Sequence, residues 1–324
     1  MAVSMRRALL GALLFAGRPG VLTAQSSSAC PILAIDSAGM LRDVFRLADD
    51  SMRGRRVGTP EGAKARDFIA ARFDALGLDR VAPGRIQPFT AATRRGSVNG
   101  FNVIGLVKGS RFAEQYVVIS AHFDHIGAVG AGAACQPTGA DSICNGADDN
   151  ASGTAALLAL ARLFEREPPQ HSLVFAAFDA EESGDVGSHA WVAAAPIPLD
   201  RILLDVNLDM VGRNATNQLY AAGPTRYPAL RPLVEQTIAC APITVTIGHD
   251  GPGSPGGEDW TNQSDQGAFH EKGIPFVYFG EEDHPDYHRA TDSADRLMPG
   301  FYASAVRAVA DFIRRFDAAP VGRP

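Results

Sequence analysis

The sequence has little of several features that would define a class of protein. Only 4 of its 324 residues are cysteine, too few for a scaffold built on disulfides. No two cysteines form a Cys-x-x-Cys pair, which argues against a thiolate zinc site. The 30 Lys and Arg residues are outnumbered by 36 Asp and Glu and form no dense basic stripe, so nucleic acid is not an expected partner. No repeat, linker or bilayer-length apolar run is present either.

The N-terminus has the pattern of a secretory signal peptide. Arginines at positions 6 and 7 precede an apolar run over residues 8–17, and small residues follow near position 24. The run is too short to span a membrane. We therefore predict a signal peptide at 1–24, a single domain at 25–324, a secreted or periplasmic location, and no membrane contact after cleavage.

Export would expose the cysteines to an oxidising compartment. Cys135 and Cys144 are nine residues apart in a Gly-rich segment, a spacing that allows a small disulfide ring. Cys30 and Cys240 would then remain. Four cysteines allow three pairings, and the sequence does not choose among them.

Short apolar runs alternate with helical patterns along the rest of the chain. Residues from about 78 to 97 are rich in turn formers and contain no predicted element. The apolar runs lack strict alternation, which indicates strands buried on both faces. This order predicts a single three-layer α/β/α domain with a mixed, mostly parallel central sheet. The predicted helices are 38–52, 60–77, 151–166, 186–195, 228–239, 264–272 and 300–316, and the strands are 101–107, 116–121, 172–178, 202–208, 218–221, 243–247 and 275–279.

Acids and histidines follow the predicted central strands, where ligands bind in sheets of this kind. Carboxylates gathered in one crevice repel each other unless cations compensate their charge. A mixture of carboxylates and imidazoles without sulfur is typical of zinc, manganese or cobalt. The clusters are His122-Phe-Asp124-His125, Asp148-Asp149, Glu181-Glu182, Asp209, and the run from Glu281 to His288 followed by Asp292.

At these positions the sequence resembles the co-catalytic di-zinc exopeptidases of metallopeptidase family 28, over roughly residues 38–316. That family includes aminopeptidases, glutamate carboxypeptidase and, as relatives, glutaminyl cyclases and the transferrin receptor. The resemblance implies the zinc exopeptidase fold, which is phosphorylase/hydrolase-like. The matching motifs are His122-x-Asp124, Gly146-Ala-Asp-Asp149-Asn-Ala-Ser-Gly153, Glu181-Glu182-Ser-Gly184, Leu208-Asp209-Met210, and Tyr287-His288 with Asp292.

Residue by residue, the resemblance implies two Zn²⁺ ions per chain, although other divalent transition metals would also suit the donors. One zinc would be bound by His122 and Asp209, and the other by Glu182 and His288. Asp149 would bridge both metals, and Glu181 would be the general base toward a metal-activated water. Asp124 and Asp292 would orient the rings of His122 and His288 by accepting their second N–H.

Several neighbouring residues are alternatives to this assignment. We expect a supporting or loop role for His125, and we expect His288 rather than His284, and Asp149 rather than Asp148, to bind metal. Asp179 is expected to be a structural acid. Ser152 is expected at a helix cap or turn, because no G-x-S-x-G pattern accompanies it. His171, His189, His249 and His270 are expected at the surface or in caps.

The resemblance favours an aminopeptidase acting on peptides. A carboxypeptidase or dipeptidase remains an alternative, with Arg213 or Arg289 as the reader of a substrate carboxylate. A glutaminyl cyclase or a non-catalytic binding domain is less favoured, because the two-metal set is complete. Many relatives have Ser-Asp-His where this chain has Ser-Asp-Gln266, which weakens the substrate assignment. Trp260, Tyr278 and Phe279 are candidate pocket residues, while the preferred side chain and the oligomeric state stay undecided.

Overall fold

The computed structural model describes residues 1, 30–31, 33–93, 96–130 and 135–319. Apart from Met1, the predicted signal peptide lies outside the described residues. The fold described here is that of the compact unit Pro31–Pro324. Among the described residues, no helix has both the length and the apolarity that a membrane span requires.

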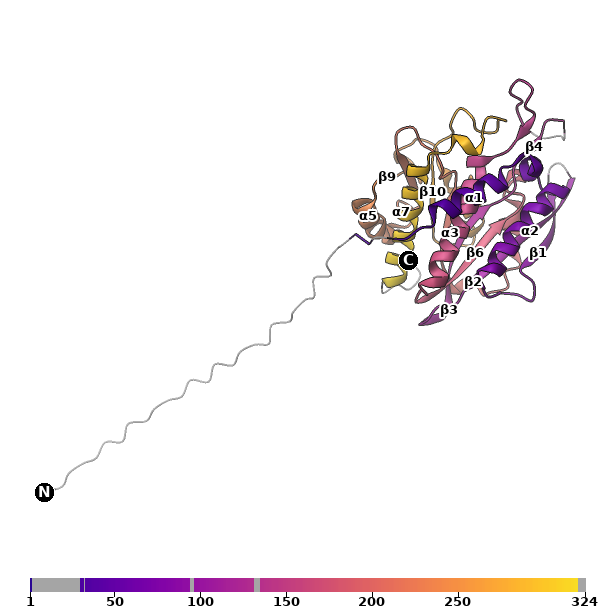
Figure 1. The fold of residues 1–324 in the computed structure, drawn as a ribbon. Coiled ribbons are helices and arrows are strands. Elements are labelled where there is room, and N and C mark those ends of the chain that lie inside the picture. The colour runs from indigo at the N-terminus through magenta and orange to yellow at the C-terminus, as the bar shows by residue number, and fades with distance from the viewer. Residues whose placement is uncertain (2–29, 32, 94–95, 131–134, 320–324) are drawn as a thin grey trace. The chain divides into compact units, whose positions relative to one another are not determined.

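An eight-stranded mixed sheet forms the centre of this unit (Figure 1). The strand order is β1-β2-β6-β3-β7-β10-β8-β9. Pairs β6–β3, β3–β7, β7–β10 and β8–β9 are parallel, and the other neighbours are antiparallel. The strands are β1 (Ile86–Thr93), β2 (Gly96–Val107), β3 (Phe112–His122), β6 (His171–Phe178), β7 (Ile202–Asp209), β8 (Gln218–Ala222), β9 (Thr244–Ile247) and β10 (Phe276–Gly280).

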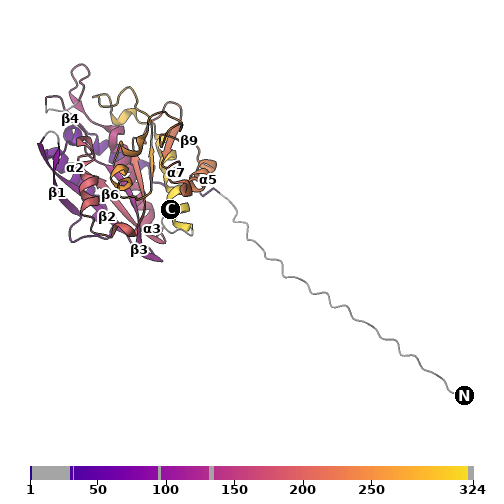
Figure 2. The ribbon, with the colours of Figure 1, turned by 180° about the vertical axis from the view of Figure 1, so that it is seen from behind.

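Helices cover both faces of the sheet, which confirms the predicted three layers. Side chains alternate between faces along a strand, so Val117 and Ile119 of β3 pack in the larger core and Val118 packs in the smaller one. The larger core lies under α1 (Ser37–Leu47), α2 (Pro60–Ala75), α3 (Gly153–Arg166), α5 (Arg231–Cys240) and α7 (Pro299–Ala318). The smaller core lies under α4 (Val186–Ala193) and α6 (Gln266–His270), on the face shown in Figure 2.

The segment expected to be turn-rich instead contains the first strand of an antiparallel hairpin. β1 pairs with β2 along its whole length, from Ile86 opposite Val103 to Thr93 opposite Gly96. β1 is an edge strand, where Pro88 is tolerated because one side of the strand needs no partner. Its side chains are only partly buried, so the sequence has no clear apolar alternation there.

Short segments complete the scaffold around the carboxyl ends of the central strands. β4 (Gly127–Ala128) and β5 (Ile143–Cys144) form a two-stranded sheet. The small ring that the cysteine spacing allows is present as a Cys135–Cys144 disulfide. The short helical segments η1 (Asp50–Arg55), η2 (Ala147–Ser152) and η3 (Glu181–Ser183) lie next to the candidate site.

Candidate metal centre

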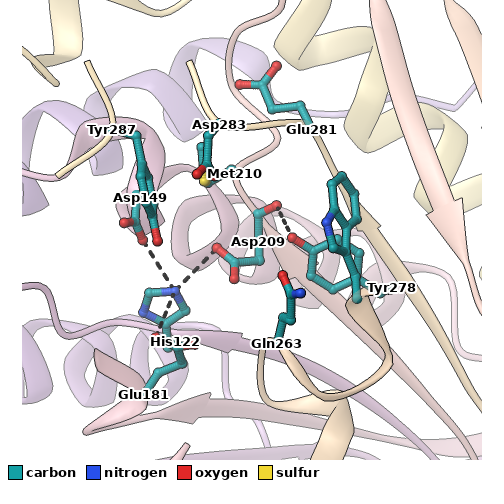
Figure 3. Close-up of a pocket in the computed structure, with 11 residues that line it drawn as sticks. His122, Asp149, Glu181, Asp209, Met210, Gln263, Tyr278, Glu281, Asp283 and Tyr287 are labelled. Atoms are coloured by element: carbon teal, nitrogen blue, oxygen red, sulfur yellow. Dashed lines mark hydrogen bonds and ion pairs between the residues drawn. The ribbon is translucent and has the colours of Figure 1, made fainter. Parts of the chain in front are cut away.

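The residues expected to bind metal meet at the carboxyl ends of the parallel strands. His122 is the last residue of β3, and Asp209 is the last residue of β7. Glu181 and Glu182 begin η3, which is separated from the end of β6 by two residues. Asp149 lies in η2 before α3, and His288 lies in the loop after β10. Figure 3 shows His122, Asp149, Glu181 and Asp209 around one pocket.

The first group of potential ligands is centred on His122. Its Nε2 lies 3.2 Å from Asp209 Oδ1 and 3.4 Å from Asp149 Oδ1. Burial opposes a charge on the ring, but Asp209, Glu181 and Asp149 surround it and raise the pKa of His122 well above its usual value. A divalent cation at this point would compensate the same carboxylates.

The second group contains two histidines facing one carboxylate. Glu182 Oε2 lies 3.3 Å from His288 Nε2, and Glu182 Oε1 lies 2.7 Å from His125 Nδ1. Asp149 Oδ2 is 3.2 Å from His288 Nε2 and 3.5 Å from His125 Nδ1. Asp149 therefore directs one oxygen to each group, as a bridging ligand would. His125 stands close enough to be an alternative ligand, so the geometry does not separate the two histidines.

Glu181 and Glu182 are adjacent in sequence but have different surroundings. Glu181 Oε2 lies 4.0 Å from His122 Nε2, at the edge of the first group. Burial raises the pKa of Glu181 well above its usual value, although His122 opposes this shift. Burial also opposes ionisation of Glu182, but His125 and His288 lower its pKa. The chain turns sharply here, with Ala180 in the left-handed region at φ 63°.

The two expected ring-orienting acids bind backbone amides instead. Asp292 accepts hydrogen bonds from the backbone N–H of Asp148 and Asp149 at 3.0–3.1 Å, and none joins it to the His288 ring among the described contacts. Asp124 Oδ1 accepts from the backbone N–H of Glu181 at 3.0 Å. Its carboxylate is 3.8 Å from His122 Nδ1, whereas its backbone oxygen is 3.2 Å away. Both acids therefore fix ligand-bearing loops, a role that spacing alone could not reveal.

Sequence reasoning missed Arg55, which is fully buried behind the site. In the described part of the chain it donates hydrogen bonds to backbone carbonyls, among them Phe123 O at 2.8 Å and Gly146 O at 2.9 Å. Burial lowers the pKa of Arg55 to about 10, while Asp149 and other acids of the site oppose that shift. An arginine in a short polar segment carries no sequence signal of burial, because arginine is ordinarily exposed.

The rival residues His284 and Asp148 face each other in a third group with Glu281. His284 Nε2 lies 3.3 Å from Asp148 Oδ2. Burial is the main reason that the pKa of Glu281 is raised to about 12, and the charge of the neighbouring Asp148 adds to the shift. Among the described ion pairs, His288 faces both Glu182 and Asp149, whereas His284 faces Asp148.

Several minor expectations were wrong. His171 is buried, and its Nδ1 lies 3.0 Å from Asp317 Oδ1. His249 is also buried, and its ring stacks on that of Trp260 with the ring centroids 3.4 Å apart. Phe279 belongs to the large core, so it is not a pocket residue. The structural role of Asp179 is confirmed, since it accepts from the backbone N–H of Phe101 and Ala180.

Other expectations about the pocket agree with the structure. Trp260 and Tyr278 line it, together with Gln263. Gln266, which replaces the usual histidine, is buried: it accepts from Asn207 at 2.8 Å and donates to Trp260 O at 2.6 Å. It therefore supports the wall formed by Trp260. Ser152 bonds backbone groups of Asp148 and Val211, a turn role as expected.

The donors fit a metal ion by their chemistry and by their lack of other partners. Both nitrogens of His125 and Oε1 of Glu182 are buried without a hydrogen bond of ordinary geometry, although His125 Nδ1 and Glu182 Oε1 are only 2.7 Å apart. Ligand atoms of His125, Asp149 and Glu182 lie within 4.8 Å of one another, close enough to hold one ion. Imidazole and carboxylate are typical ligands of zinc.

Comparison with known proteins agrees with the fold and the motifs. Aminopeptidase YwaD of Bacillus subtilis is 28% identical over 263 residues, which cover 76% of this chain but 49% of that protein, so the chain spans about half the length of this curated relative. The solved aminopeptidase from Aneurinibacillus sp. strain AM-1 superposes with a TM-score of 0.69 at 16% identity, covering 90% of this chain and 96% of that one. A glutaminyl cyclase of Bacteroides thetaiotaomicron also reaches 0.69, at 18% identity, covering 88% of this chain and 99% of that one. These similarities to solved structures establish the fold and leave the reaction open. The family model described as "Peptidase family M28" matches residues 102–313, and the chain belongs to that family.

Proposed function

We propose that this protein is an exported, zinc-dependent aminopeptidase that removes N-terminal residues from peptides. Membership of the M28 family and the aminopeptidase relative YwaD support a peptidase activity. The leader pattern at 1–24 and the Cys135–Cys144 disulfide support export, because disulfides persist mainly in oxidising compartments.

The observation that carries the choice of aminopeptidase is the charge of the pocket. No lysine or arginine occurs among its described lining residues, whereas it contains five acids: Asp149, Glu181, Asp209, Glu281 and Asp283. Zinc would compensate Asp149 and Asp209, so the choice depends mainly on the missing cation: no described lining side chain would bind a terminal carboxylate, whereas Asp283 would attract the cationic α-amine of a peptide. Arg213, one candidate reader of a carboxylate, is held by Asp286 at 2.8 Å and lies outside the pocket lining.

We assign the metal ligands as the sequence predicts. His122 and Asp209 would hold one zinc, Glu182 and His288 the other, and Asp149 would bridge them. Bound zinc would polarise the substrate carbonyl and lower the pKa of a water molecule, which supplies a nucleophile at neutral pH.

Glu181 would accept the proton of the attacking water and deliver it to the leaving amine. Its side chain borders the His122 group, and its raised pKa suits a group that must hold a proton within the catalytic cycle. The Asp124 carboxylate holds the backbone N–H of Glu181 and so fixes the start of the turn that carries it.

Matched substrates test this proposal. Leucyl-p-nitroanilide and Leu-Gly should be hydrolysed, while their N-acetylated forms should not. Chelation should abolish hydrolysis, and added Zn²⁺ should restore it. The variant Arg213→Gln should leave hydrolysis of the free-amine substrates intact.

Rapid hydrolysis of acetyl-Leu-Gly, lost in Arg213→Gln, would instead indicate a carboxypeptidase. Cyclisation of an N-terminal glutaminyl peptide without hydrolysis would indicate a cyclase. A protein that neither binds zinc nor hydrolyses any of these substrates would be a binding domain.

A further inference from the structure

A third group of potential metal ligands lies outside the proposed two-metal centre. Donor atoms of Asp148, Glu281 and His284 all lie within 4.8 Å of one another. Asp148 belongs to η2, while Glu281 and His284 follow β10 on the segment that leads to His288. In Figure 3 the carboxylate of Glu281 points away from His122 and Asp209. We call these three residues the Asp148 cluster.

Donor atoms of the Asp148 cluster are buried and lack hydrogen-bond partners. Asp148 is fully buried and Glu281 is 3% exposed. Asp148 Oδ2, both carboxylate oxygens of Glu281 and Nε2 of His284 make no hydrogen bond of ordinary geometry within the described chain. The three side chains nevertheless interact: His284 Nε2 lies 3.3 Å from Asp148 Oδ2, and burial together with Asp148 raises the pKa of Glu281. One ligand atom from each residue is therefore close enough to the other two for all three to hold one ion.

The charge of the cluster also calls for a counter-ion. Two carboxylates buried side by side cost several kcal/mol unless a cation or a proton compensates them. The guanidinium of Arg213 pairs with Asp286 at 2.8 Å, and its charge lowers the pKa of Glu281 less than burial and Asp148 raise it. Asp148 Oδ1 already accepts the backbone N–H of Gly212 at 2.7 Å, which orients the carboxylate and leaves Oδ2 for another partner.

We propose that Asp148, Glu281 and His284 bind a third divalent cation of the zinc or manganese class. The donor set of one imidazole and two carboxylates matches that of the His122 group, so the same metals suit it. Glu281 also lines the pocket, which lets water complete the coordination shell. By binding residues of both segments, this cation would hold the loop that carries His288 against the segment that carries Asp149. It would have no part in the chemical step.

Metal counting tests the site directly. The purified full chain is stripped by chelation, dialysed against buffered Zn²⁺ and analysed by inductively coupled plasma mass spectrometry. The wild type should hold three zinc ions, and Glu281→Gln and His284→Gln should each hold two. Glu282→Gln is the matched control, because Glu282 is the next carboxylate along the chain, is exposed and faces His249 at 3.3 Å; it should hold three.

A second measurement covers the case in which His284→Gln does not fold. Glu281→Gln preserves side-chain size, and its thermal unfolding can be followed during a Zn²⁺ titration. The midpoint of the wild type should rise further with the third equivalent, and that last rise should be missing in Glu281→Gln.

The outcomes separate this proposal from the proposed function. Two zinc ions in both the wild type and Glu281→Gln would mean that Asp148 and Glu281 share a proton, which overturns the third site but leaves the two-metal centre. Three ions in Glu281→Gln would also overturn it. No zinc in the wild type would overturn both proposals.

Discussion

Arg55 donates a 2.8 Å hydrogen bond from Nε to the carbonyl oxygen of Phe123, the residue that follows His122. The same guanidinium donates to Asn145 O at 2.6 Å and to Gly146 O at 2.9 Å, just before η2. One buried cation therefore joins the end of β3 to the loop that presents Asp149. It also places a positive charge behind a group of carboxylates, which stabilises them before any metal binds.

The variant Arg55→Lys should be strongly destabilised. Lysine cannot reproduce the planar set of donors, so several buried carbonyls would lose their partners. We expect a loss of roughly 3–5 kcal/mol in the free energy of unfolding and a fall of about 10- to 100-fold in zinc affinity. Urea denaturation and competition with a zinc indicator measure the two effects. The exposed Arg80→Lys is the control, and an equal effect there would contradict this role for Arg55.

Replacing the proposed general base should separate catalysis from metal binding. Glu181→Gln keeps the size of the side chain but cannot take up a proton from water. We expect kcat on leucyl-p-nitroanilide to fall by about 10²- to 10⁴-fold, with zinc content and unfolding temperature unchanged. Wild-type turnover by this variant would show that another group is the base.

The histidines beside Glu182 should differ in their effect on zinc content. We expect His288→Ala to lose one zinc ion and almost all activity. His125→Ala should keep both ions of the centre, with affinity lower by about 10- to 100-fold, as expected for a residue that only supports a ligand. Metal analysis of both variants after identical dialysis makes the comparison. The reverse result would assign the ligand position to His125.

Asp205 should make stability depend on pH. It is fully buried in β7, with Oδ1 accepting from Ser120 Oγ at 2.9 Å and Oδ2 without a partner. Burial raises the pKa of Asp205 well above its usual value. The folded state therefore holds a proton that the unfolded state releases above about pH 3.9, so this residue destabilises the fold increasingly as pH rises through that window.

The variant Asp205→Asn should remove this dependence, because it stays neutral and can still accept from Ser120. Its advantage in unfolding free energy over the wild type should grow by about 1.4 kcal/mol per pH unit until the pH passes the folded pKa. Urea unfolding at pH 5, 6 and 7 measures the difference. The exposed Asp200→Asn should show no such trend, and a constant gap for Asp205→Asn would contradict the buried-acid explanation.

The sheet and the positions of the candidate-site motifs were accessible from sequence because they depend on local patterns. The runs at β3, β6, β7 and β10 are largely apolar and lack strict alternation since both faces are covered, and each leads into acids or histidines. Strand direction then places His122 and Asp209 at the same edge of the sheet. Strand β1 was missed, although much of its partner β2 was predicted, because an exposed edge strand needs neither alternation nor a complete set of N–H donors.

The sequence by itself determined the fold class, the order of the motifs and the carboxylate–imidazole chemistry of the site, since these follow from residue type and periodicity. Only the tertiary structure decided which atoms meet. It placed Asp292 under the backbone of Asp148 rather than beside His288, brought His125 within 2.7 Å of Glu182, and buried Arg55 against loops 68 and 91 residues away. These contacts join segments remote in sequence through hydrogen bonds whose directions are fixed by packing, and no local pattern encodes such directions.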